Sequence, residues 1–99
     1  MVKHIVMWKL RQSAHGNDKT TNAKLIKEKL ESLNGKIEGL LKAEVGIDFL
    51  GGGNFDIVLY SELVDSNALD SYQQHPLHQE ILPFIREAVE DRKAVDFKI

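Results

Sequence analysis

The sequence predicts a single α+β domain in which helices cover one face of an antiparallel sheet. Segments in which apolar and polar residues alternate, as in strands, flank two segments whose apolar residues recur at helical spacing. The resulting order β-α-β-β-α-β is typical of a split β-α-β sandwich. The chain has 99 residues, 42% of them apolar, which is enough for one core and too little for two. Residues 1–99 are therefore expected to form one domain.

The first half of the chain is predicted to hold a strand, a helix and a second strand. The strand covers residues 2–11, and one of its faces carries Val2, His4, Val6, Trp8 and Leu10. After a polar loop at 13–18, the helix carries apolar residues at helical spacing: Ala23, Ile26, Leu30, Leu33 and Ile37. Asn17 or Asp18 is expected to cap its start, and Gly35 or Gly39 to end it. Residues 41–49 alternate again and predict the second strand.

The second half is predicted to hold a strand, two helical stretches and a closing strand. A hairpin loop at 51–54 leads into a strand over residues 55–64. Asp65 or Ser66 caps a short helix that stops before Pro76, because proline disfavours helical geometry in the preceding residue. A helical stretch covers 77–91, in which Pro83 either kinks the helix or sits in the first turn of its longer part. The closing strand covers 92–99.

The face of the sheet away from the helices is predicted to bind a second copy of the chain. Ile5 and Met7 of the first strand and Val58 and Tyr60 of the third lie on that face, which would be mostly polar if water covered it. A homodimer joined through this outer face would cover these residues symmetrically. Scattered surface apolar residues are the alternative, but these fall on two strands that the topology places side by side.

Composition excludes several classes of function. A net charge of -2 gives no excess positive field, so nucleic acid is not an expected partner. The absence of cysteine excludes disulfides, thiolate metal sites and a cysteine nucleophile. No apolar stretch reaches the ~20 residues of a membrane span, and the N-terminus does not read as an export signal. A cytoplasmic protein that does not bind membranes is expected.

The segment 72–78, Tyr-Gln-Gln-His-Pro-Leu-His, holds two of the four histidines. Helical phase turns His78 inward, and Tyr72 lies on the inner face of the preceding helix. His4 shares the apolar face of the first strand, so the three side chains are expected to meet between sheet and helices. The predicted cavity binds a small, largely apolar carbonyl or phenolic compound, and its lining residues are His4, Val6, Trp8, Ile57, Leu59, Tyr72 and His78.

Other readings of the histidines remain open. His75, ahead of proline, fits a helix cap as well as a substrate contact, and His4 can be purely structural. His75 and His78 have a spacing that could bind a metal on a helix face, but no third ligand is near. We therefore predict no metal and no cofactor. His15 lies in the polar loop without an expected role.

Several segments, by their order and spacing along the chain, resemble the stress-responsive dimeric A/B-barrel (Dabb) domain family. They are Val2-Lys3-His4-Ile5-Val6, Val45-Gly46, Tyr72, His75-Pro76-Leu77-His78 and the closing Asp91-Arg92-Lys93-Ala94-Val95-Asp96-Phe97. The resemblance implies a ferredoxin-like α+β fold whose dimer forms a barrel. Some plant members of the family are cofactor-free polyketide cyclases that use pocket histidine and tyrosine for proton transfer. That implication transfers to His4, Tyr72, His75 and His78, whereas Phe55, Ile57 and Leu59 add no polar partner.

Two hypotheses follow. In the first, the protein is a cofactor-independent enzyme of the cyclase type, with His78 as general base or acid and Tyr72 as hydrogen-bond partner of a developing oxyanion. His4 orients the substrate, and His75, Val6, Trp8, Ile57 and Leu59 contact it. In the second, the domain is a non-catalytic ligand-binding or stress-protective dimer whose histidines are structural.

Overall fold

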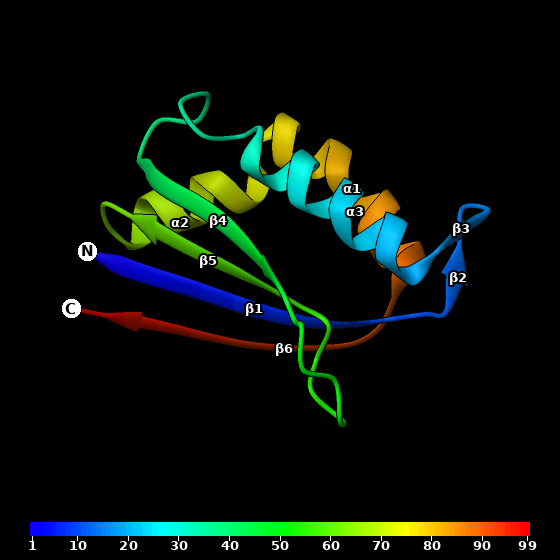
Figure 1. Cartoon of the computed structure of the whole chain (residues 1–99). Helices are drawn as coiled ribbons and strands as arrows, with labels where there is room; N and C mark the ends of the chain where they lie inside the picture. The colour runs from blue at the N-terminus through cyan, green and yellow to red at the C-terminus, as the bar shows by residue number, and fades with distance from the viewer.

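The computed structural model describes residues 1–99 as helices packed on one face of a four-stranded sheet (Figure 1). The sheet is antiparallel, has the order β4-β5-β1-β6 and places β1 between β5 and β6. The fold is therefore ferredoxin-like, as predicted. The elements are β1 (Val2–Leu10), β2 (Ser13–Ala14), β3 (Asn17–Asp18), α1 (Lys19–Glu31), β4 (Leu40–Ile47), β5 (Ile57–Leu63), α2 (Ser66–Gln74), α3 (Pro76–Ala88) and β6 (Val89–Lys98).

The core lies between the sheet and the helices. Alternate residues of β1 and β5 point into it and are buried: Val2, His4, Val6, Trp8, Leu10, Ile57, Leu59, Ser61 and Leu63. The predicted inner face of β1 is thus confirmed. Ile26 and Leu30 of α1 and Ile85 of α3 close the core from the helical side. No helix is both long and apolar enough to cross a membrane.

Helix α1 begins where the sequence predicts and ends earlier. The Asp18 carboxylate accepts a hydrogen bond from the Thr21 backbone N–H at 2.8 Å, which confirms the cap. The helix ends at Glu31, so the predicted end at Gly35 or Gly39 is wrong. Asn34 explains the early end, because its side chain pairs with both the backbone N–H and the carbonyl of Ala43 at 2.8 Å. An asparagine that bonds backbone elsewhere competes with the helix.

Helices α2 and α3 are joined at His75. Asp65 caps α2 by accepting a bond from the Ala68 N–H at 2.8 Å, as predicted, and Pro83 lies inside α3. The expected helix end at residue 91 is wrong, because β6 begins at Val89. Pairing with β1 sets this boundary: Val89 stands opposite Leu10, and the Arg11 N–H donates to the Ala88 carbonyl at 2.9 Å.

The expected polar loop at 13–18 is a small hairpin of β2 and β3 with His15 at its turn. The His15 ring stacks on Phe84 of α3, with ring centroids 4.0 Å apart and planes 3° apart. Its Nε2 donates to the Phe84 carbonyl at 2.9 Å. His15 therefore has a structural role that the sequence did not indicate, since it fastens this hairpin to α3.

We predict that Gly39→Ala destabilises the fold more than Gly35→Ala. Both glycines have positive φ, which costs an alanine about 1 to 2 kcal/mol. A Cβ on Gly39 would lie 2.7 Å from the Ala68 Cβ, whereas one on Gly35 meets nothing within 4 Å. Overpacking adds about 1 to 3 kcal/mol at Gly39 alone. Urea unfolding of both variants measures the difference, and equal losses would contradict the close approach.

Candidate functional site

A cavity of about 400 Å³ opens between the sheet and α3. Its walls are mainly apolar, with polar groups from α2, α3, β1 and β6 among them, which is the usual character of a small-molecule site. The lining residues are His4, Val6, Trp8, Leu30, Leu59, Gln73, His78, Gln79, Leu82, Ile85, Arg86 and Arg92. We call this space the inner cavity.

Five of the residues expected at this site line the inner cavity: His4, Val6, Trp8, Leu59 and His78. Three do not. Ile57 is buried at the start of β5 and borders a recess on the opposite face of the sheet. Tyr72 is fully buried beside the cavity rather than on its wall. The expectation that these two residues line the cavity is therefore corrected.

His75 also lies away from the inner cavity. Its Nδ1 accepts a hydrogen bond from the Leu77 N–H at 3.1 Å and so caps α3. It borders a separate pocket of about 420 Å³ near Gly39 instead, so the expected substrate contact is corrected to the capping role. His78 uses its own Nδ1 in a different bond, and no cluster of three or more histidine, aspartate or glutamate side chains is arranged to hold a metal.

His78 occupies the first turn of α3, where Pro76 at the helix start fixes the backbone. Its Nδ1 lies 3.0 Å from the Gln73 carbonyl. Because a carbonyl only accepts, Nδ1 carries the hydrogen, and Nε2 of the neutral ring is left as an acceptor. Burial lowers the pKa of His78, against the opposing effect of the Gln73 carbonyl. The ring is therefore neutral near pH 7 and able to take a proton.

Tyr72 packs against His78, with ring centroids 4.6 Å apart, and its ring centroid lies 6.4 Å from that of His4. Its hydroxyl is buried and has no hydrogen-bond partner within the protein. Burial raises the pKa of Tyr72 to about 12, so the phenol keeps its proton throughout the physiological range. An unpaired buried hydroxyl costs stability, and such costs tend to be retained at functional sites.

His4 is held from two sides by groups that the sequence did not single out. Asp96, its cross-strand partner on β6, bonds His4 Nδ1 through a carboxylate oxygen. Ser61 Oγ, also buried, donates to the His4 carbonyl at 2.7 Å. The inner face of β5 therefore does offer a polar side chain, Ser61, beyond the three residues considered from the sequence. The Asp96 contact orients the His4 ring at the cavity wall, and the Ser61 bond holds its backbone.

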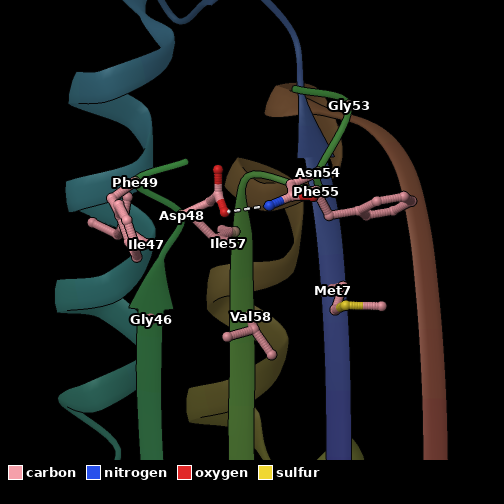
Figure 2. A pocket seen from close by; sticks show the side chains of 10 residues that line it. All are labelled: Met7, Gly46, Ile47, Asp48, Phe49, Gly53, Asn54, Phe55, Ile57 and Val58. Carbon is pink, nitrogen blue, oxygen red and sulfur yellow. Dashed lines mark hydrogen bonds between the residues drawn. The ribbon is translucent and has the colours of Figure 1, made fainter. Parts of the chain in front are cut away.

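A second recess, of about 610 Å³, lies on the outer face of the sheet at the β4–β5 end (Figure 2). Met7 of β1 and Val58 of β5 project from this face beside Phe55. The only ionisable group in its lining, Asp48, accepts bonds from the Gly51 N–H at 2.7 Å and from Asn54 at 3.0 Å. The bond from Gly51 lowers the pKa of Asp48. This carboxylate shapes the hairpin loop, and the recess offers apolar surface rather than acid–base groups.

Together, the sheet topology and the inner cavity define a ferredoxin-like α+β domain with a cavity between sheet and helices. The family profile described as the stress responsive A/B barrel domain matches residues 2–99. The chain therefore belongs to the stress-responsive A/B barrel (Dabb) domain family. Among curated proteins, no relative was found.

Solved structures with this fold include proteins described as dimeric. One, from Bacteroides fragilis, is a dimeric ferredoxin-like protein of unknown function with 35% identity and a TM-score of 0.88 over 99% of this chain and 95% of that one. Another, a dimeric protein of unknown function from Thermobifida fusca, has 25% identity and a TM-score of 0.85 over 99% and 90%. The hydroxynitrile lyase of Passiflora edulis shares the fold, with 16% identity and a TM-score of 0.80 over 99% and 92%.

We predict that Tyr72→Phe leaves the free energy of unfolding unchanged or raises it by up to about 2 kcal/mol, because no hydrogen bond is lost and a buried polar group is removed. Tyr60→Phe is the matched control, since the Tyr60 hydroxyl accepts from Lys3 at 2.7 Å and donates to Glu62. Chemical denaturation measures both variants. A loss above about 1 kcal/mol for Tyr72→Phe would show that its hydroxyl is bonded.

Proposed function

We propose that the protein binds a small, largely apolar carbonyl or phenolic compound in the inner cavity and that His78 exchanges a proton with it. The observation that carries this proposal is the free Nε2 of a neutral His78 in an apolar-walled cavity. Nδ1 is occupied by the Gln73 carbonyl, so Nε2 is the acceptor that a ligand hydroxyl or an acidic C–H would meet. A general base works best when its pKa keeps it unprotonated at the working pH.

Tyr72 and His4 have supporting parts in the proposed reaction. The protonated Tyr72 phenol is a donor for an oxyanion, in contrast to the basic His78, so burial gives the two groups opposite roles. Because Tyr72 is fully buried and does not line the cavity, its hydroxyl reaches a ligand only after neighbouring side chains shift. His4, fixed by Asp96 and Ser61, orients the ligand from β1. No cofactor takes part in this scheme.

We predict that 2-naphthol, a phenolic probe, binds the protein more tightly than 2-methoxynaphthalene, which has no hydroxyl to donate. The affinity for 2-naphthol should fall as pH is lowered through the depressed pKa of His78, below 6.5, because a protonated imidazole cannot accept a bond. The affinity for 2-methoxynaphthalene should not change with the protonation of His78. Isothermal calorimetry between pH 5 and about 8 measures both ligands.

His78→Leu is the decisive variant, with His75→Leu as the matched control outside the cavity. His78→Leu should abolish the preference for 2-naphthol and its pH dependence, and His75→Leu should retain both. The cost in stability is expected to stay below about 1 kcal/mol, because Gln79 also donates to the Gln73 carbonyl, at 2.6 Å, and keeps it paired. A larger loss, with no ligand effect in either protein, would favour purely structural histidines.

We also propose that two copies associate through the outer face of the sheet. Ten large apolar residues are exposed, and none lies on a helix. On the outer face, Ile5 of β1 pairs with Val95 of β6, and Lys3 pairs with Phe97. Every residue of β6 after Val89 is exposed, an unusual state for a ten-residue edge strand unless something covers it. The dimeric relatives named above support the proposal.

Two charged groups on this face, Lys3 and Glu62, are compatible with burial in such a dimer. Lys3 bonds Tyr60 and lies 3.8 Å from a carboxylate oxygen of Glu62 within the same protomer. Both ions therefore bring a partner into the interface. Burial of charges that are already paired is less costly than burial of isolated ones.

We predict that Val58→Asp dissociates the dimer, because an unpaired carboxylate would be buried at the centre of the outer face. Thr20→Asp, which adds the same charge at an exposed position of α1, should leave association intact. Light scattering at micromolar concentration measures the mass of each variant, and circular dichroism confirms that both are folded. A monomeric parent protein, or a dimeric Val58→Asp variant, would contradict the proposed interface.

A further inference from the structure

Two of the chain's three arginines line the inner cavity. Arg86 belongs to α3 and Arg92 to β6, so they approach the cavity from the helical layer and from the sheet. No other charged side chain is part of the lining. The cavity thus combines an apolar interior with positive charge from two directions.

Neither guanidinium has a partner within the protein. The six ion pairs of the chain involve lysine or histidine as the cation, and no side-chain hydrogen bond comes from Arg86 or Arg92. Asp96, which lies on the inner face of β6 with Arg92, bonds His4 instead. Each guanidinium therefore keeps its donors available for a group that enters the cavity.

The fold explains why both arginines face the same space. His78, Leu82 and Arg86 are four residues apart along α3 and so share one face of the helix. Arg92 stands opposite Trp8 in the β1–β6 register, which puts it on the inner face of the sheet. Arg86 is near enough to His78 for its charge to act on that ring. One helix face and one strand register thus bring two cations and the histidine together.

Solvation by water is the usual state of an exposed arginine, and Arg86 and Arg92 are both exposed. Two features set them apart from a solvated surface pair. They come from different layers of the fold into the same cavity, and its lining contains no acidic residue to neutralise them. Arginine binds planar carboxylates through two parallel hydrogen bonds, which a lysine cannot reproduce.

We propose that the ligand of the inner cavity carries a carboxylate or a similar anionic group, which binds Arg86 and Arg92 while its apolar body reaches toward His78. This inference rests on the proposed function, since it requires that the cavity binds a ligand. The inference adds to the proposed function that the ligand is anionic and that its charged group lies at the Arg86 and Arg92 side of the cavity. Arg86 and Arg92 are then the residues that select acids over neutral compounds of the same shape.

The test compares matched acids and primary amides, which have nearly the same size and differ in charge. The probes are 2-naphthoate, 4-phenylbutyrate and 4-tert-butylbenzoate, each with its amide. The parent protein should bind at least one acid about 3- to 10-fold more tightly than its amide, as expected for charge-assisted bonds near solvent. Raising the salt concentration should weaken binding of the acid and leave the amide unaffected.

Arg86→Gln and Arg92→Gln should each remove most of the preference for the acid, and Arg11→Gln, the remaining arginine and an exposed one outside the cavity, should keep it. Equal binding of acids and amides by the parent would overturn the anionic ligand and leave the proposed function standing. An acid preference that survives both cavity variants would also overturn it. Failure of all six probes and of 2-naphthol to bind would overturn the proposed function itself.

Discussion

The position of β1 at the centre of the sheet determines the two surfaces to which we assign the proposed functions. Its alternate residues are buried toward the helices, where His4, Val6 and Trp8 form one wall of the inner cavity. The residues between them, Ile5 and Met7, point to the other face. Since the period of a strand is two, a shift of one residue in this register would exchange these sets. Pairing of β1 with both β5 and β6 prevents that shift.

Burial separates the chemistry of the two central polar residues. The same loss of water that lowers the pKa of His78 raises that of Tyr72 to about 12, because desolvation disfavours a cation in one case and an anion in the other. A base without its proton and a phenol that keeps its proton are thus neighbours at neutral pH. Pairs of groups whose pKa values are moved apart by their surroundings are a common basis for acid–base function.

Residues whose placement follows from local periodicity were predictable from the sequence. His4, Val6 and Trp8 follow from the strand period, and His78 follows from helical phase after Pro76. The contact of Asp96 with His4 was not predictable from the sequence, because it depends on a strand register between residues 92 positions apart. For the same reason Arg92 gave no local signal, and no sequence pattern singled out Arg86. The early end of α1 depended on the contact between Asn34 and Ala43, which also joins separate elements.

The inner cavity and the outer face lie on opposite sides of one sheet, so a dimer would leave the cavity free on each protomer while covering β6 and its neighbours. Heteronuclear NMR of the four histidine side chains tests the central claim most directly, since it reports tautomer and pKa together. His78 should be the Nδ1–H tautomer when neutral, with a pKa below 6.5. An Nε2–H tautomer, or a pKa at or above 6.5, would contradict the assignment of His78 as the base of the cavity.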